Sequence, residues 1–124
     1  MSEPTGWPTE LRLTKDRRTL VVAFDDGAVY ELPAEYLRVE SPSAEVQGHG
    51  PGQRKTVSGK REVEILNLEE VGNYAVRIAF DDLHSTGIYT WDHLAELGRE
   101  HDARWADYLA ELAEKGLSRD RARA

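Results

Sequence analysis

The chain has 124 residues, of which 40% are hydrophobic and 31% charged, and its formal net charge is −7 at pH 7. This length fits one domain with an ordinary hydrophobic core and excludes collagen-like, coiled-coil and fully disordered proteins. No apolar run approaches the roughly 18 residues that cross a bilayer, and residues 1–10 do not form a secretory signal. The absence of cysteine excludes disulfides, thiolate catalysis and cysteine-ligated metals, so we expect a cytoplasmic protein.

Apolar patterns predict one domain over residues 10–116, built largely from strands. Residues 1–9 contain two of the five prolines and should form an extended lead-in. Alternating or β-branched apolar residues then predict six short strands, over 11–14, 20–24, 28–32, 63–68, 74–80 and 87–90. Turns with glycine separate several of these strands, as in Asp25-Asp26-Gly27 and Val71-Gly72-Asn73.

Helices are predicted after the third strand and at the C-terminal end. A short helix over 34–37 should begin after Pro33, and Thr90 is the expected N-cap of a helix that Gly98 ends. A last helix covers about 102–115, ends at Gly116 and should bury one apolar stripe, made of Trp105, Tyr108, Leu109 and Leu112. The fold class is α+β, with about six short, mostly antiparallel strands in a small sheet and two C-terminal helices packed on it. Residues 117–124 form a basic tail that we expect to be disordered.

An internal repeat organises the chain. Ala23-Phe24-Asp25-Asp26 recurs as Ala79-Phe80-Asp81-Asp82, each time at the end of an apolar strand. Both copies are followed by a turn, an apolar residue with a tyrosine, and the start of a helix. The two halves therefore share one plan of strand, turn, strand and helix.

Residues 40–61 are predicted to form a long loop, since they hold two prolines, four glycines and three serines without apolar periodicity. Such loops are usually functional or mobile, and we expect little core burial over 47–59. Four basic residues without an intervening acid give the loop a positive face suited to an acidic partner surface. Its candidate binding residues are Ser41, Ser43, His49, Arg54, Lys55, Lys60 and Arg61. The acidic composition argues against nucleic acid as a partner.

No catalytic constellation is visible in the sequence. No serine lies in a Gly-x-Ser-x-Gly elbow, the loop glycines lack P-loop spacing, and the four histidines do not form an iron facial triad. Asp81, Asp82 and His84 lie close together at a strand end and could ligate a divalent metal such as iron or zinc. The competing interpretation is a solvated turn in which His84 is hydrogen-bonded to Asp81 or Asp82.

Several stretches are similar to a known family: Leu37-Arg38, 41–46 (SPSAEV), 71–76 (VGNYAV) and 80–91 (FDDLHSTGIYTW). They resemble the small bacterial proteins similar to the N-terminal domain of gamma-butyrobetaine hydroxylase, long catalogued as a domain of unknown function. The resemblance covers Pro8 to about Leu112. In eukaryotic hydroxylases this domain precedes an iron- and 2-oxoglutarate-dependent catalytic domain, and a related domain occurs in some iron–sulfur cluster carrier ATPases.

The resemblance implies a degenerate metal site. The hydroxylase domain holds a structural zinc through three cysteines and one histidine, whose positions correspond to Ser41, Ser43, Val46 and His84. Valine cannot ligate a metal and serine hydroxyls are poor zinc ligands, so we expect no zinc and no other cofactor. The catalytic iron ligands belong to a separate domain, and we expect no hydroxylase activity from this chain.

Two functional hypotheses follow. The first is a non-catalytic binding module, a monomer or weak homodimer, that docks on a protein of iron or iron–sulfur metabolism through the loop 41–61 and the neighbouring turn 81–86. The second is a metal-binding protein that uses His84 with Asp81 or Asp82, joined by His49. An independent enzyme has no supporting constellation, and no membrane association is expected.

Overall fold

The computed structural model describes residues 7–43, 46, 55–85 and 87–120. The predicted α+β class and the six strands are confirmed, but the strands form two sheets rather than one. Within the described ranges no helix is long and apolar enough to cross a membrane. The elements follow in the order β1 (Pro8–Leu13), β2 (Thr19–Phe24), β3 (Val29–Pro33), α1 (Ala34–Val39), β4 (Ile65–Val71), β5 (Ala75–Phe80), β6 (Gly87–Thr90), α3 (Trp91–Arg99) and α4 (His101–Lys115).

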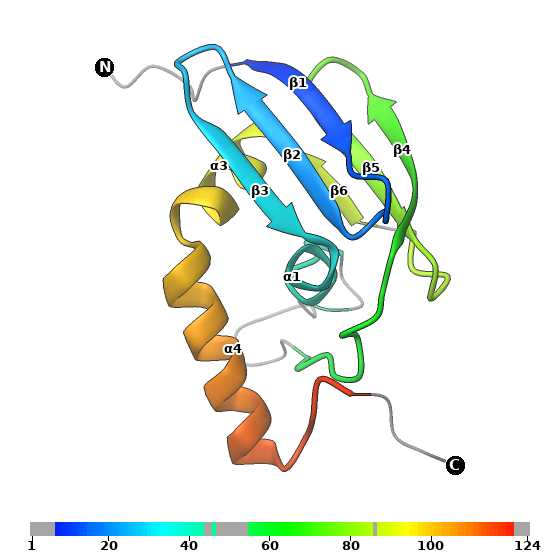
Figure 1. The fold of residues 1–124 in the computed structure, drawn as a ribbon, viewed down its shortest axis with the longest axis vertical. Helices are drawn as coiled ribbons and strands as arrows, with labels where there is room; N and C mark the ends of the chain where they lie inside the picture. The colour runs from blue at the N-terminus through cyan, green and yellow to red at the C-terminus, as the bar shows by residue number, and fades with distance from the viewer. Residues whose placement is uncertain (1–6, 44–45, 47–54, 86, 121–124) are drawn as a thin grey trace.

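The two sheets are antiparallel and have the strand orders β1-β2-β3 and β4-β5-β6. Figure 1 shows the first sheet in front of the second, with α1 at one end of the sheets and α4 along one side of the molecule. Alternate residues of a strand face the same side, and the inward-facing residues of both central strands are buried in one core cluster. They are Leu20, Val22 and Phe24 of β2, and Val76, Ile78 and Phe80 of β5.

The internal repeat corresponds to two structural units. Three antiparallel strands followed by a helix occur twice, as β1-β2-β3-α1 and as β4-β5-β6-α3. Both helices contribute to the main core, α1 through Tyr36 and Leu37 and α3 through Leu94 and Leu97. The second strand pair of each unit therefore leads into a helix that packs against the same core.

Helix α3 begins as predicted but does not end at Gly98. The side chain of Thr90 accepts a hydrogen bond from the backbone N–H of His93 at 3.1 Å, which confirms the N-cap. The helix continues through Gly98 to Arg99, so the predicted stop was wrong. A Cβ at Gly98 would lie 2.3 Å from Cγ of Tyr30, and glycine therefore permits close packing on β3 rather than ending the helix.

Helix α4 packs in a second, smaller cluster. Tyr108 and Leu112 are buried there, and Gly116 closes the helix in the left-handed conformation, as predicted. Leu109 was predicted to be part of the buried stripe, but 40% of it is exposed. The reason is that the cluster contacts only a narrow face of α4. This face is covered by three side chains, one from α1 and two from the segment between α1 and β4: Val39, Val46 and Val57.

The described part of the C-terminal tail is held against the domain. Backbone hydrogen bonds join Gly59 to Ser118 at 2.9 Å and Arg61 to Arg119 at 3.0 Å. The Arg119 guanidinium also donates two hydrogen bonds, of 2.8 and 2.6 Å, to the buried carboxylate of Glu35. Residues 117–120, which we expected to belong to a disordered tail, are therefore tied down because a buried carboxylate requires a cation. Residues 121–124 lie outside the described ranges.

Candidate functional site

His84 lies in a buried polar cluster next to the turn that follows β5. Its Nε2 atom is 2.9 Å from Oγ of Ser41 and 3.4 Å from Oγ of Ser43, and all three residues are buried. The backbone N–H of His84 donates to Oδ1 of Asp82 at 3.2 Å. The predicted hydrogen bond to Asp82 therefore exists for the backbone only, because the turn directs the imidazole inward to the two serines.

These contacts bring together three of the four positions that the resemblance assigns to zinc ligands. The fourth, Val46, is buried in the second core cluster and offers no donor atom. Two hydroxyls and one imidazole do not fit zinc, which takes thiolate, imidazole and carboxylate ligands. Within the described part of the chain, no three His, Asp or Glu side chains are grouped so that they could hold a metal ion. His49 lies outside that part.

Removal of metal should accordingly leave the fold unchanged. We expect the melting temperature of the purified, untagged protein to be the same before and after treatment with a chelator, because the core is formed by apolar side chains and the imidazole of His84 is hydrogen-bonded to hydroxyls. Differential scanning calorimetry with parallel elemental analysis measures both quantities. A melting temperature that falls by several degrees together with the loss of a stoichiometric metal would contradict this prediction.

The contact between Ser41 and His84 has the geometry of a nucleophile and its base, which the sequence reasoning did not anticipate. Ser41 has no exposed surface and His84 only 4%, so a substrate could not reach the hydroxyl in this conformation. The pair fastens the turn after β5 to the segment that follows α1. The role of this pair is therefore to fix the position of the turn.

Asp82 connects two cations beside this cluster. Its Oδ2 atom accepts a hydrogen bond from Nε of Arg38 at 2.8 Å and forms an ion pair with Nζ of Lys60 at 2.6 Å. Burial raises the pKa of Asp82, but the hydrogen bonds and positive charges of Lys60 and Arg38 outweigh it and hold the pKa below its ordinary value of 3.8. Asp82 is thus ionised at neutral pH and holds both cations near the turn.

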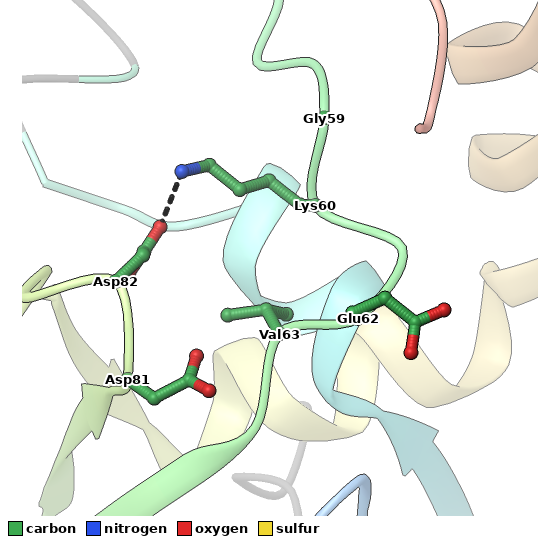
Figure 2. A pocket seen from close by; sticks show the side chains of 6 residues that line it. All are labelled: Gly59, Lys60, Glu62, Val63, Asp81 and Asp82. Carbon is green, nitrogen blue, oxygen red and sulfur yellow. Dashed lines mark ion pairs between the residues drawn. The ribbon is translucent and has the colours of Figure 1, made fainter. Parts of the chain in front are cut away.

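A small pocket of about 180 Å³ lies between this turn and the segment 59–63 before β4. Figure 2 shows Lys60 extending toward Asp82, with Val63 and Asp81 below this ion pair in the view. Asp81 is fixed by two hydrogen bonds with the backbone of Glu64, one of 2.9 Å through its N–H and one of 3.1 Å through its carboxylate. The lining is strongly polar and both aspartates already have partners.

The predicted basic residues of the long loop have different partners in the structure. Lys60 pairs with Asp82, and Arg61 pairs with Asp120 at 2.5 Å, whereas Lys55 is exposed. Arg54 lies outside the described residues. The expectation of little core burial over 47–59 is wrong at Val57, which is 7% exposed, because Tyr108 donates a hydrogen bond of 2.7 Å to its carbonyl and the second cluster covers its side chain.

The turn at 81–84 has a close counterpart in the first unit of the repeat. In the turn at 25–28, Gly27 N–H donates to the Phe24 carbonyl at 3.1 Å, and Ala28 N–H donates to Oδ1 of Asp26 at 2.9 Å. The second turn has the same pair of bonds, from Leu83 N–H to the Phe80 carbonyl at 3.1 Å and from the next residue to Asp82. The third residue of each turn has a positive φ, +91° at Gly27 and +72° at Leu83.

Leu83 is the feature of this site that the sequence reasoning missed. A left-handed conformation is disfavoured for leucine by about 1–2 kcal/mol and costs glycine almost nothing. Leu83 is also 88% exposed, the highest exposure among the large hydrophobic residues described. The repeat contained the signal, because aligning the two Phe-Asp-Asp motifs places Leu83 opposite Gly27.

The fold and this site define a small α+β domain made of two three-stranded units, with a serine and histidine cluster behind its second turn. The model of the family described as gamma-butyrobetaine hydroxylase-like, N-terminal, matches residues 11–95, and the chain belongs to this family. None of the curated proteins searched matches the chain significantly.

Solved structures of similar proteins share the fold. An NMR solution structure of a protein 46% identical in sequence superposes with a TM-score of 0.82, and the match covers 97% of this chain and 94% of the other. A second NMR solution structure, at 41% identity, has a TM-score of 0.81 and coverages of 100% and 97%. A crystal structure of a protein of unknown function from Acidithiobacillus ferrooxidans, of the DUF971 family, is 37% identical with a TM-score of 0.64, and covers 78% of this chain and 98% of its own.

Proposed function

We propose that this protein is a non-catalytic docking module that binds a protein partner through the turn 81–85, with Leu83 as the apolar anchor. The observation that carries the proposal is the exposed leucine in a backbone conformation that favours glycine. A strained residue persists only where its surroundings hold it, and such residues cluster at functional sites. The equivalent turn, with Gly27, shows that the same geometry is attainable without this strain.

The backbone of the turn is held firmly in the conformation that exposes Leu83. Hydrogen bonds close it on both sides, from Phe80 N–H to the His84 carbonyl at 2.8 Å and from Leu83 N–H to the Phe80 carbonyl. Behind it, His84 is buried against Ser41, and Asp82 is bonded to Arg38 and Lys60. Little conformational entropy would therefore be lost on binding, which favours affinity.

The chemistry of the turn specifies the partner. Burial of a leucine side chain contributes about 1.5–3 kcal/mol, so the partner should offer an apolar pocket that covers Leu83. Acidic groups on the rim of this pocket would face Lys55, which is exposed in the neighbouring segment. Rim charges of this kind raise the rate of association more than the affinity. Proteins of iron or iron–sulfur metabolism are the first partners to test, given the proteins in which related domains occur.

Replacing Leu83 by asparagine should remove partner binding without damaging the fold. Asparagine tolerates the left-handed conformation, so we expect the free energy of unfolding to stay the same or rise by up to about 1 kcal/mol. Affinity for the partner should fall at least about tenfold, which corresponds to ~1.4 kcal/mol. To identify the partner, wild-type and variant proteins are used at low salt to capture binding proteins from cells, and the captured proteins are identified by mass spectrometry. The affinity of each variant is then measured with the purified partner.

Leu66→Asn is the matched control. Leu66 is 51% exposed on β4, and its replacement removes a similar apolar side chain away from the turn. A partner that is retained by wild-type protein and by the Leu66 variant but lost by the Leu83 variant supports the proposal. If the same proteins are captured with equal affinity by all three, Leu83 is not an anchor and the proposed docking site is wrong.

A further inference from the structure

A basic pocket lies beside the docking turn, between the end of α1 and residues 55–60. Its volume is about 250 Å³, and three of the residues that line it are the cations Arg38, Lys55 and Lys60. Hydroxyl groups of Thr56 and Ser58 line the same space. On a chain of net charge −7, three cations around one hollow are a local concentration of positive charge.

Arg38, which lines this pocket, carries one side-chain donor without a partner in the described part of the chain. Its side chain is only 12% exposed, and Nε is bonded to Asp82. Its Nη1 atom is buried and has no hydrogen-bond partner among the residues that the structure describes. A buried guanidinium N–H without an acceptor is unfavourable, and natural proteins rarely leave one in that state. An oxygen atom of a ligand bound in the pocket would satisfy it if the guanidinium turned toward the pocket.

The acidic groups nearby do not cancel the positive charge. Asp82 pairs with both Arg38 and Lys60 through one oxygen atom, which brings these two cations close together and leaves a net positive charge on the described lining of the pocket. On the side of α4, Glu111 accepts a hydrogen bond from the hydroxyl of Thr56 at 3.4 Å, and Lys115 donates to the same hydroxyl at 2.7 Å. The carboxylates of Asp82 and Glu111 thus each have at least one lysine nearby.

We propose that this pocket binds the phosphate group of a small molecule. Guanidinium and ammonium donors combined with hydroxyls are the groups with which proteins hold phosphate, and the surplus of positive charge matches a dianion better than a single carboxylate. The volume lies below the range of about 300–1,000 Å³ that is typical of drug-sized ligands, which indicates a small ligand. The proposal is independent of the docking role of Leu83.

The test is a titration of the full chain with inorganic phosphate at constant ionic strength, followed by NMR through the backbone amides. We expect saturable shifts at Lys55, Thr56, Ser58 and Lys60 with a millimolar dissociation constant. Lys55→Gln should weaken binding about tenfold, or ~1.4 kcal/mol. Arg38→Gln should abolish saturation, and because Arg38 contacts Asp82, its spectrum is first checked for a native fold. If that variant unfolds, Lys55→Gln still decides the question.

Lys15→Gln is the matched control, since Lys15 is an exposed lysine in the turn between β1 and β2. Unchanged phosphate binding by this variant and by Leu83→Asn supports a specific pocket that is separate from the docking anchor. Shifts that never saturate, or an equal loss in the Lys15 and Lys55 variants, would show general charge attraction and overturn the proposal. Binding of a phosphoserine peptide much more tightly than free phosphoserine would overturn the assignment of a small molecule.

Discussion

Replacing Arg119 by alanine should lower the free energy of unfolding by about 2–3 kcal/mol, a large effect for a residue five positions before residue 124. Arg119 donates two hydrogen bonds to Glu35, whose side chain is 7% exposed, and its guanidinium lies 5.1 Å from the ring centroid of Trp105. Removing it leaves a buried carboxylate without its cation and uncovers the indole. Chemical denaturation followed by tryptophan fluorescence measures the change.

Arg61→Ala is the control for this prediction. Arg61 also pairs with an acid, Asp120, but 42% of its side chain and 66% of that of Asp120 are exposed, so the loss should stay below about 1 kcal/mol. Adding Glu35→Met to the Arg119 variant should recover much of the lost stability, because the buried charge is removed. Equal effects of the two arginine substitutions, or no recovery in the double variant, would mean that the tail contributes only weak surface contacts.

Gly98→Ala should destabilise the protein by about 2 kcal/mol, although alanine within a helix is ordinarily favoured over glycine, by up to about 1 kcal/mol. The reversal is expected because the new Cβ would lie 2.3, 2.5 and 2.7 Å from Cγ, Cδ1 and Cδ2 of Tyr30. Displacement of the Tyr30 ring would also disturb its edge-to-face contact with Phe24, in which the ring centroids are 6.0 Å apart. Thermal and urea unfolding both report the loss.

A double-mutant cycle tests the stated cause. In a Tyr30→Ala background the space beside Gly98 is open, so Gly98→Ala should there become neutral or stabilising by up to about 1 kcal/mol. The sign of the alanine substitution would thus depend on one aromatic ring. A stabilising effect in the wild-type background would contradict the tight contact between α3 and β3.

Features with local causes could be predicted from the sequence. The β-branched, apolar run over 20–24 identified a strand, and Thr90 and Gly116 marked helix ends because capping depends on a few neighbouring residues. Gly98 was misread for the complementary reason. A glycine that ends a helix and one that admits a neighbouring ring look alike in sequence, and only the tertiary contact distinguishes them.

The candidate site shows the same division between features with local causes and features that depend on tertiary contacts. The family resemblance pointed to Ser41, Ser43 and His84 as neighbours, and they lie together, but spacing along the chain alone gave no sign of it. The partner of Arg119 is 84 residues away in sequence, so the order in the tail had no local signal. Leu83 was within reach of sequence reasoning, because the internal repeat aligns it with a glycine whose positive φ is expected in a tight turn.

The second core cluster has a consequence for cooperativity. It joins α4 to Val46 and Val57 with few buried side chains, whereas both sheets share the much larger main core. Weakly packed regions open by sub-global unfolding at lower free energy than the rest of a domain. Val46, Val57 and Ser58 also line the basic pocket, so a ligand bound there would stabilise this less cooperative region first, by mass action, and would slow amide hydrogen exchange in it more than in the sheets.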